Sequence, residues 1–147
     1  MRKEYRAVSV PEPPVASSCR PRRPGGPAEA RRAVERAVAA RCRDTGTICD
    51  RESMADALLV VSELTTNALL HGGGITGFRI DVVESGVRVS VCDRSEAVPL
   101  TKDPLDGHGR RRVGGLGWPI VCRLSRDVRV TGLPSGGKCI SAVVPLP

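Results

Sequence analysis

Two polar residues on one predicted helix are the first candidates for chemistry. Glu63 and Asn67 are four positions apart within a helical pattern that runs from about Met54 to His71, and this spacing makes them neighbours on the helix surface. A carboxamide oxygen can coordinate Mg²⁺, and a carboxylate can orient or deprotonate a nucleophile. The pair suits a magnesium–triphosphate site, but on its own it is equally typical of a helix with scattered polar residues.

The two faces of this helix differ in composition. At 3.6 residues per turn, one apolar face would contact a sheet. Its members are Met54, Leu58, Val61, Thr65 and Ala68. The face that carries Glu63 and Asn67 also carries apolar residues, which predicts a partly enclosed pocket around the carboxylate. These residues are Leu59, Val60 and Leu70.

Two later segments offer complementary chemistry. Asp93 ends an apolar strand, where its carboxylate could accept a hydrogen bond from an exocyclic amine such as that of adenine; an isolated Asp there can also simply form a turn. Gly115 and Gly117 flank Leu116 just before a predicted helix. Free backbone amides and the positive end of the helix dipole favour phosphate at such a place, although a plain tight turn has the same glycines.

The elements that must position these residues alternate between helical and strand patterns. Asp50 or Ser53 can cap the second helix, and the glycines that follow His71 end it. The expected helices are Pro27–Arg43, Met54–His71 and Gly115–Leu124, and the expected strands are Gly77–Val83, Val87–Asp93, Asp127–Thr131 and Cys139–Val144. This order predicts an α+β protein, a two-layer sandwich with helices on one face of a mixed, mostly antiparallel sheet.

Two segments do not fit regular structure. Residues Met1–Gly26 hold five of the twelve prolines and read as a flexible basic tail before a domain at 27–147, with a short edge strand at Tyr5–Val10 as an option. Residues Arg94–Val113 read as a long mobile loop. This loop contains Arg110-Arg111-Arg112, which could clamp a γ-phosphate or could only be solvated.

The three candidate segments, taken in this order, resemble the boxes of the GHKL ATPases. Ser62–Gly72 resembles the N box, Val91–Ser95 with Pro99 the first glycine box, and Gly115–Val121 the second. Within that superfamily the chain is most similar to the small anti-sigma-factor serine/threonine kinases. These share an opening helix with Pro-x-x-x-x-Arg and a closing hairpin like Gly136-Gly137-Lys138.

The resemblance implies a fold of the Bergerat type, ATP and Mg²⁺ as cofactors, and a role for each matching residue. Glu63 would be the general base or water-orienting carboxylate, Asn67 the magnesium ligand and Asp93 the adenine contact. The phosphates would lie against Gly115, Leu116 and Gly117. Ser95 stands where the superfamily often has glycine, and its hydroxyl would join the adenine network through water. His71 would either close the nucleotide site or serve as a helix cap, and Trp118 would pack under the loop.

The implied activity is that of an ATP-dependent protein serine/threonine kinase. It would phosphorylate a small antagonist protein, sequester a sigma factor, or do both. A catalytically silent regulator, in which ATP orders a loop and so controls partner binding, is the alternative. A histidine kinase is disfavoured because no dimerisation helices with a phosphoacceptor precede the motifs, and His71 lies inside one of them. Dimerisation of the chain stays open.

Charge and composition argue against other classes. The formal charge of +7 comes from the first 43 residues, which hold eleven Lys or Arg against four Glu. With aromatic residues at only 2%, base stacking on single-stranded nucleic acid is disfavoured, so nucleic-acid binding through the basic tail is the weakest hypothesis. No apolar run suits a membrane helix or a signal peptide, so we expect a cytoplasmic protein in which all six cysteines are reduced.

Overall fold

Residues 23–99 and 117–147 are described in the computed structural model of this chain. In these ranges the order of helices and strands is the predicted one, with most boundaries shifted by one to three residues. The helices are α1 (Pro27–Thr45), α2 (Arg51–His71) and α3 (Gly117–Leu124), and the strands are β1 (Ile75–Val83), β2 (Gly86–Asp93), β3 (Arg126–Gly132) and β4 (Lys138–Pro145).

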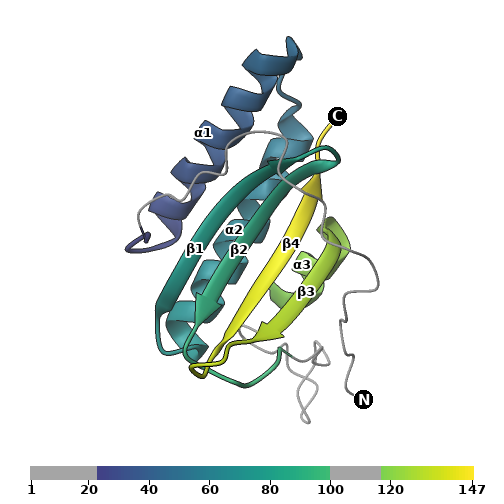
Figure 1. Cartoon of the computed structure of the whole chain (residues 1–147). Helices are drawn as coiled ribbons and strands as arrows, with labels where there is room; N and C mark the ends of the chain where they lie inside the picture. Colours follow the sequence, from purple (N-terminus) through teal and green to yellow (C-terminus); the bar gives the residue numbers. More distant parts are fainter. Residues whose placement is uncertain (1–22, 100–116) are drawn as a thin grey trace, which may run out of the picture.

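The four strands form one sheet in the order β1-β2-β4-β3, and each neighbouring pair is antiparallel. All three helices lie on the same face of this sheet, with α2 behind its centre and α3 behind β4 and β3 (Figure 1). The predicted α+β class and the covering of one sheet face by helices are therefore confirmed. No parallel pair occurs among the described strands, so this part of the sheet is antiparallel rather than mixed.

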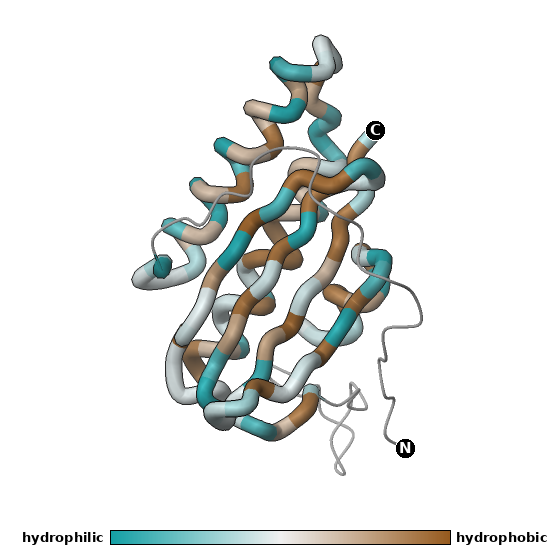
Figure 2. Tube along the Cα trace, viewed as in Figure 1, coloured by the Kyte–Doolittle hydropathy of each residue, from teal (hydrophilic) through white to brown (hydrophobic). Residues whose placement is uncertain are grey.

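The core lies between the sheet and α2. Alternate residues of β2 point toward the helices and are fully or almost fully buried, as the period of two in a strand requires. These residues are Val87, Val89 and Val91. Apolar positions follow the same alternation along the strands in Figure 2. The core is thus mostly aliphatic, and its aromatic members among the described residues are Phe78 and Trp118.

The predicted faces of α2 are partly corrected. Val61, Thr65 and Ala68 are buried as expected, whereas Met54 and Leu58 only line the edge of the core. The prediction that apolar side chains partly enclose Glu63 is wrong. Val60 is completely buried in the core, whereas Leu59 and Leu70 are exposed. The buried face of this helix is wider than the sequence pattern predicted, and it includes Val60.

The start of α2 is fixed by a side-chain cap. Asp50 is the N-cap residue, and one of its carboxylate oxygens accepts hydrogen bonds from the Ser53 backbone N–H at 2.9 Å and the Ser53 hydroxyl at 2.7 Å. Of the two candidates, Asp50 is thus the cap. The hydrogen bonds from the Ser53 hydroxyl and then its backbone N–H lower the pKa of Asp50. The cap places the first turn of the helix that carries Glu63.

The Asp50 cap predicts a pH dependence of stability. Because the pKa of Asp50 is lower in the folded than in the unfolded chain, its contribution is complete above the unfolded pKa and is lost as the pH falls through the folded one. We expect Asp50→Asn, which keeps an acceptor oxygen but does not titrate, to lose less stability than the native protein between about pH 5 and about pH 2. Urea unfolding at each pH measures this, and equal losses would contradict the cap.

The start of α1 follows the prediction as well. Pro27 is the first helical residue, a position that tolerates proline because the missing N–H would have no helical partner. Before it, Arg23 donates a hydrogen bond through Nη1 to the carbonyl of Ile75 at 3.3 Å. Residues 1–22 of the expected tail, and with them Tyr5–Val10, lie outside the described residues. None of the described helices is long and apolar enough to cross a bilayer.

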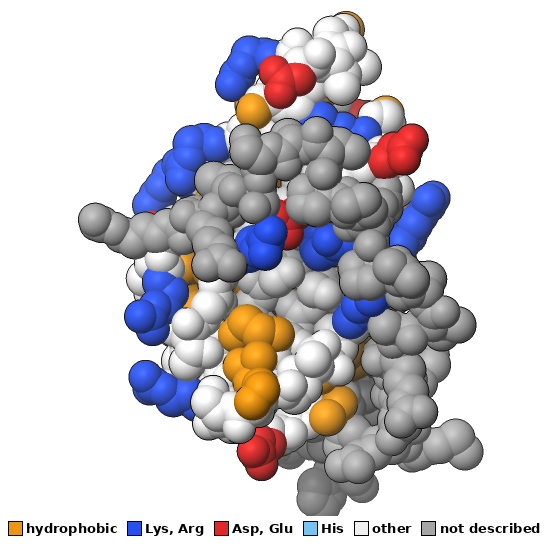
Figure 3. All heavy atoms as spheres, in the orientation of Figure 1, with side chains coloured by type: hydrophobic (Ala, Val, Ile, Leu, Met, Phe, Trp, Pro, Cys, Tyr) orange, Lys and Arg blue, Asp and Glu red, His pale blue; other side chains and the backbone are white. Residues whose placement is uncertain are grey.

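Charged side chains lie on the face of the sheet turned away from the helices. Arg79 and Arg88 alternate with core residues of β1 and β2, so they point away from the helices. Arg79 pairs there with Asp81 at 3.0 Å. Figure 3 shows this side of the molecule, where Lys and Arg side chains are spread over the surface with few acidic ones between them. The candidate site residues lie toward the helices and not on this face.

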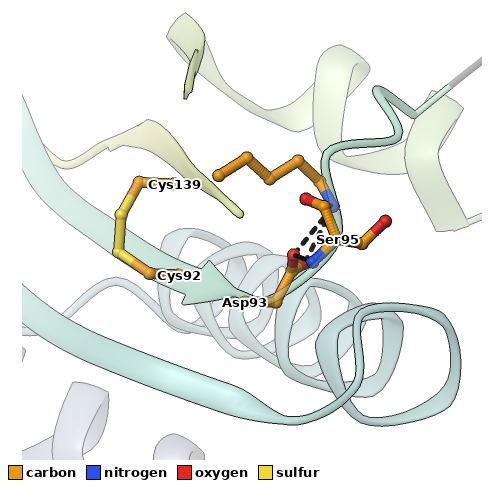
Figure 4. The surroundings of a disulfide bond; sticks show 5 residues. Cys92, Asp93, Ser95 and Cys139 are labelled. Carbon is orange, nitrogen blue, oxygen red and sulfur yellow. Dashed lines mark hydrogen bonds and ion pairs between the residues drawn. A yellow bond between two sulfur atoms is a disulfide. The ribbon is translucent and has the colours of Figure 1, made fainter. Parts of the chain in front are cut away.

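The structure corrects the expectation that all cysteines are reduced. Cys92 of β2 and Cys139 of β4 are register partners on the outer face, and their sulfur atoms form a disulfide (Figure 4). The two positions are far apart in sequence, so only the strand pairing shows that they meet. Among the described residues, Cys42, Cys49 and Cys122 take part in no disulfide. A hydrogen bond with the Cys42 thiol raises the pKa of Cys49.

The disulfide predicts a measurable difference between the native and the reduced protein. Alkylation in denaturant should modify two fewer thiols before reduction than after it, counted by mass spectrometry. Because the link joins residues 47 positions apart, its reduction should lower the free energy of unfolding by up to about 4 kcal/mol in the chain-entropy account. Cys139→Ser is the control, since Cys92 then becomes reactive without reductant. Equal alkylation before and after reduction would contradict the cross-link.

Candidate functional site

Helix α2 carries three of the predicted site residues on one stripe. Glu63, Asn67 and His71 follow each other at four-residue intervals, which keeps them on one side of the helix. Glu63 and Asn67 are half-buried, whereas His71 ends the helix and is exposed. The opposite side is anchored in the core, where the Thr65 hydroxyl donates a hydrogen bond to the Val61 carbonyl at 2.7 Å. The core therefore orients the stripe away from the sheet.

The carboxylate of Glu63 lies against the first residue of α3. Gly117 is buried, and a Cβ atom added to it would overlap Oε2 of Glu63. Only a glycine leaves room for the carboxylate at this place. The structure thus brings together a carboxylate of the segment that resembles the N box and the start of the helix that follows the segment resembling the second glycine box. Gly115 and Leu116 lie outside the described residues, as do Arg110-Arg111-Arg112.

The far end of α2 meets the end of β2. A Cβ atom on Gly72 would come within 2.5 Å of the Asp93 carboxylate, so the helix terminus and the strand terminus are in direct contact. The backbone N–H of Arg94 donates to the Gly72 carbonyl at 2.8 Å, and the Arg94 guanidinium donates to the Gly73 carbonyl at 3.2 Å. One helix therefore spans from the predicted base contact at Asp93 to the predicted phosphate end at Gly117.

Asp93 is buried and already has protein partners. Its Oδ1 accepts hydrogen bonds from the Ser95 backbone N–H at 2.9 Å and from Lys138 Nζ at 3.0 Å, and its Oδ2 accepts from Lys138 Nζ at 2.9 Å. Figure 4 shows Asp93 and Ser95 beside the disulfide at the ends of these strands. Asp93 is 5% exposed and Lys138 is 7% exposed, so the ion pair is shielded from water.

Because the ion pair is buried, a ligand cannot easily displace Lys138 from Asp93. Removing one partner of a buried pair leaves an uncompensated charge and costs about 3–5 kcal/mol. A single hydrogen bond to a charged group contributes about 1.5–3 kcal/mol. A ligand that offers one such hydrogen bond to Asp93 therefore gains too little to displace Lys138, and the two must share the carboxylate.

Lys138 contacts the candidate site residue Asp93, and this contact was not predicted from the sequence. In the sequence, Lys138 stands out only as the last residue of the hairpin motif Gly136-Gly137-Lys138. The available signal was register: Lys138 precedes the alternating residues of β4, at the position that pairs with Asp93 in β2. A cation opposite a strand-end carboxylate predicts an ion pair, but the pairing of β2 with β4 could not be read from local pattern.

Two further predicted residues have defined surroundings. The Ser95 hydroxyl accepts a hydrogen bond from the Ala97 backbone N–H at 3.1 Å, and it is the backbone N–H of Ser95 that contacts Asp93. Trp118 is 5% exposed and packs in the main core. The part of the loop under which it was expected to pack lies outside the described residues.

The donors present fit a magnesium ion held mainly by phosphate oxygens. The described residues contain no cluster of three or more His, Cys, Asp or Glu side chains that could hold a metal ion by themselves. Mg²⁺ commonly keeps few protein ligands and takes the rest from substrate phosphates and water. The half-buried Asn67, one turn from Glu63, offers a carboxamide oxygen for such a site.

Comparison with known proteins shows the family of this chain. The family model "Histidine kinase-like ATPase domain" matches residues 24–144, and the chain therefore belongs to this family. A similar solved structure is the histidine kinase domain from the Erythrobacter litoralis EL346 blue-light activated histidine kinase, at 22% sequence identity and a TM-score of 0.43. That match covers 80% of this chain and 61% of the other, less than two thirds of its length. No curated protein matches the sequence.

The contact between Glu63 and Gly117 predicts a selective loss of activity. A methyl group at residue 117 must push the Glu63 carboxylate aside, and this is tolerable for the fold because the carboxylate ends a flexible side chain. We expect Gly117→Ala to melt near the native temperature but to turn over ATP about a hundredfold more slowly, since small displacements of a reacting group have effects of this size. Phosphate release from ATP measures the loss.

Gly132→Ala is the matched control for this variant. Gly132 ends β3, and a Cβ atom there would meet nothing within 4 Å. The control should keep native turnover and native melting. Native turnover in Gly117→Ala would show that the position of the Glu63 carboxylate does not matter.

Proposed function

We propose that this chain is an ATP-dependent protein serine/threonine kinase that regulates a sigma factor. It would transfer the γ-phosphoryl group of ATP to a serine or threonine of a small antagonist protein, and its nucleotide state would decide whether it holds the sigma factor. One observation carries the proposal: α2 joins the Glu63 carboxylate, in contact with Gly117 of α3, to the buried Asp93 carboxylate at the end of β2, within the histidine kinase-like ATPase family.

Each residue has a defined part in this mechanism. Asp93 accepts a hydrogen bond from the exocyclic amine of adenine, and the backbone amides at the start of α3 bind phosphate oxygens. Asn67 would hold the magnesium ion, which neutralises phosphate charge when bound. Glu63 accepts the proton of the attacking hydroxyl through its carboxylate. Phosphoryl transfer needs little covalent chemistry from the protein, so positioning and charge account for most of the rate.

The anti-sigma-factor subtype rests on two motifs of the resemblance. Arg32 lies five positions after Pro27 in the first turns of α1. The hairpin motif Gly136-Gly137-Lys138 joins β3 to β4 and packs against Asp93, since a Cβ atom on Gly137 would overlap the Asp93 carbonyl and Lys138 pairs with its carboxylate. The first motif lies at the start of α1, and the second lies next to Asp93, where the proposal places the base.

Removing the Glu63 carboxylate should separate binding from chemistry. Glu63→Gln keeps the size of the side chain but cannot take the proton, so we expect transfer to a serine-containing antagonist protein to fall below detection with γ-labelled ATP. Mg-ATP should still raise the melting temperature of the variant as it does for the native protein. At a hundredfold excess over Kd, a ligand stabilises the native state by about 2.7 kcal/mol.

Asp93→Asn serves as the opposite control, because its altered base contact should weaken Mg-ATP binding and so reduce the Mg-ATP melting shift. Simultaneous loss of transfer and melting shift in Glu63→Gln would mean that this residue is structural. A native protein that shows the shift but transfers phosphate to none of the tested antagonists would contradict the kinase and leave a regulator controlled by ATP binding. A native protein with no shift would contradict nucleotide binding itself.

A further inference from the structure

The contact between Lys138 and Asp93 gives β4 a part in base recognition. We propose that Lys138 is a positioning residue. Its ammonium group holds the Asp93 carboxylate in one orientation, with a single acceptor position on Oδ2 left for the exocyclic amino group of a purine nucleotide. This inference rests on the proposed nucleotide site and adds to it a residue that selects the base.

The acceptor positions of Asp93 are nearly all occupied. An ionised carboxylate offers about four lone-pair positions on its two oxygens. Among the residues that the structure describes, Oδ1 takes the Ser95 backbone N–H and one ammonium hydrogen of Lys138, whereas Oδ2 takes only Lys138. The side of Oδ2 nearest α2 is closed by Gly72, whose lack of a side chain makes this approach feasible. What remains is one acceptor position with a fixed direction.

The ammonium group of Lys138 needs no hydrogen-bond acceptor from a ligand. An ammonium group carries three donor hydrogens. Nζ finds three acceptors, namely the two oxygens of Asp93 and, at 3.3 Å, the carbonyl of Ser95. Withdrawal of Lys138 would leave a buried charge, so the ion pair persists when a nucleotide binds. Lys138 orients the carboxylate and does not compete for it.

The backbone fixes Lys138 relative to Asp93. The two residues are register partners, and the preceding step of the same ladder is Cys92 with Cys139, which are joined by the disulfide. The disulfide therefore holds the ends of β2 and β4 together on the outer face of the sheet. At the next pair of residues, the ion pair holds them together on the face that carries the helices. The distance between ammonium and carboxylate cannot drift with the strands.

This arrangement selects a base that donates at its six position. The single acceptor position of Oδ2 matches the amino group of adenine. A purine without a substituent there makes no hydrogen bond, and one with a carbonyl oxygen directs a lone pair at the carboxylate. Loss of Lys138 frees the carboxylate to turn, so the preference for the amino group should fall while contacts to the triphosphate persist.

The test compares two nucleotides in four proteins. Dissociation constants for Mg-ATP and for the magnesium complex of purine riboside triphosphate, which lacks the amino group, are measured for the native protein, Lys138→Met, Asp93→Asn and the double variant. We expect the native preference for ATP to fall about tenfold in Lys138→Met, which corresponds to about 1.4 kcal/mol. The affinity for purine riboside triphosphate should stay within about threefold.

In the Asp93→Asn background, Lys138→Met should change the preference by less than about twofold, because the two residues act as a unit. A purely structural role would lower both affinities equally in both backgrounds, and that result would overturn the proposal. Tighter ATP binding by Lys138→Met would also overturn it, since it would mean that Lys138 competes with the base. A native protein that binds neither nucleotide contradicts the proposed function first.

A second measurement uses only the native protein, in case Lys138→Met does not fold. The ammonium signal of a ¹⁵N-labelled Lys138 is followed by NMR while Mg-ATP is added. We expect the signal to remain, because the ion pair with Asp93 is kept in the complex. Loss of the signal by release of the ammonium group to solvent would overturn the proposal.

Discussion

The structure depends on the docking of α2 across the sheet. Its buried stripe, with Val61 and Thr65 at the centre, packs on β1, β2 and β4 and fixes the rotation of the helix. That rotation decides where Glu63 and Asn67 point. Because the same helix ends against Asp93 and passes Gly117 midway, one packing interface sets the separation between the two ends of the candidate site. A substitution in the buried face of α2 would therefore change the geometry at both Asp93 and Gly117.

The second constraint is the joined end of β2 and β4. Asp93 and Lys138 place opposite charges in a setting nearly free of water, and such a pair is tolerable only because each partner finds the other together with further hydrogen bonds. The neighbouring disulfide lies on the opposite face. The ion pair and the disulfide thus hold this end of the sheet rigid. The rigid end is also where the proposed base would bind, and recognition of a base there depends on the direction of a hydrogen bond as well as on contact area.

Local pattern predicted most of the fold and the identity of the candidate residues. Pro27 and Asp50 mark helix starts because proline and a carboxylate have defined effects on unpaired backbone amides. The position of Asp93 followed from the end of an apolar strand. The contacts that complete the site were beyond this reasoning, since Lys138 and the bond between Cys92 and Cys139 depend on which strands are neighbours. Register across 45 residues is a property of the assembled sheet.

We infer one arrangement, in which the stripe of α2, the end of β2 and the start of α3 face one nucleotide. It is tested most directly by an NMR titration of ¹⁵N-labelled protein with the magnesium complex of a non-hydrolysable ATP analogue. The account predicts that amide shifts concentrate at residues 63–72, 93–95, 117–119 and 136–138, with little change at the hairpin of Glu84 and Ser85 at the other end of the sheet. Shifts confined to other surfaces, or to only one of these segments, would contradict it.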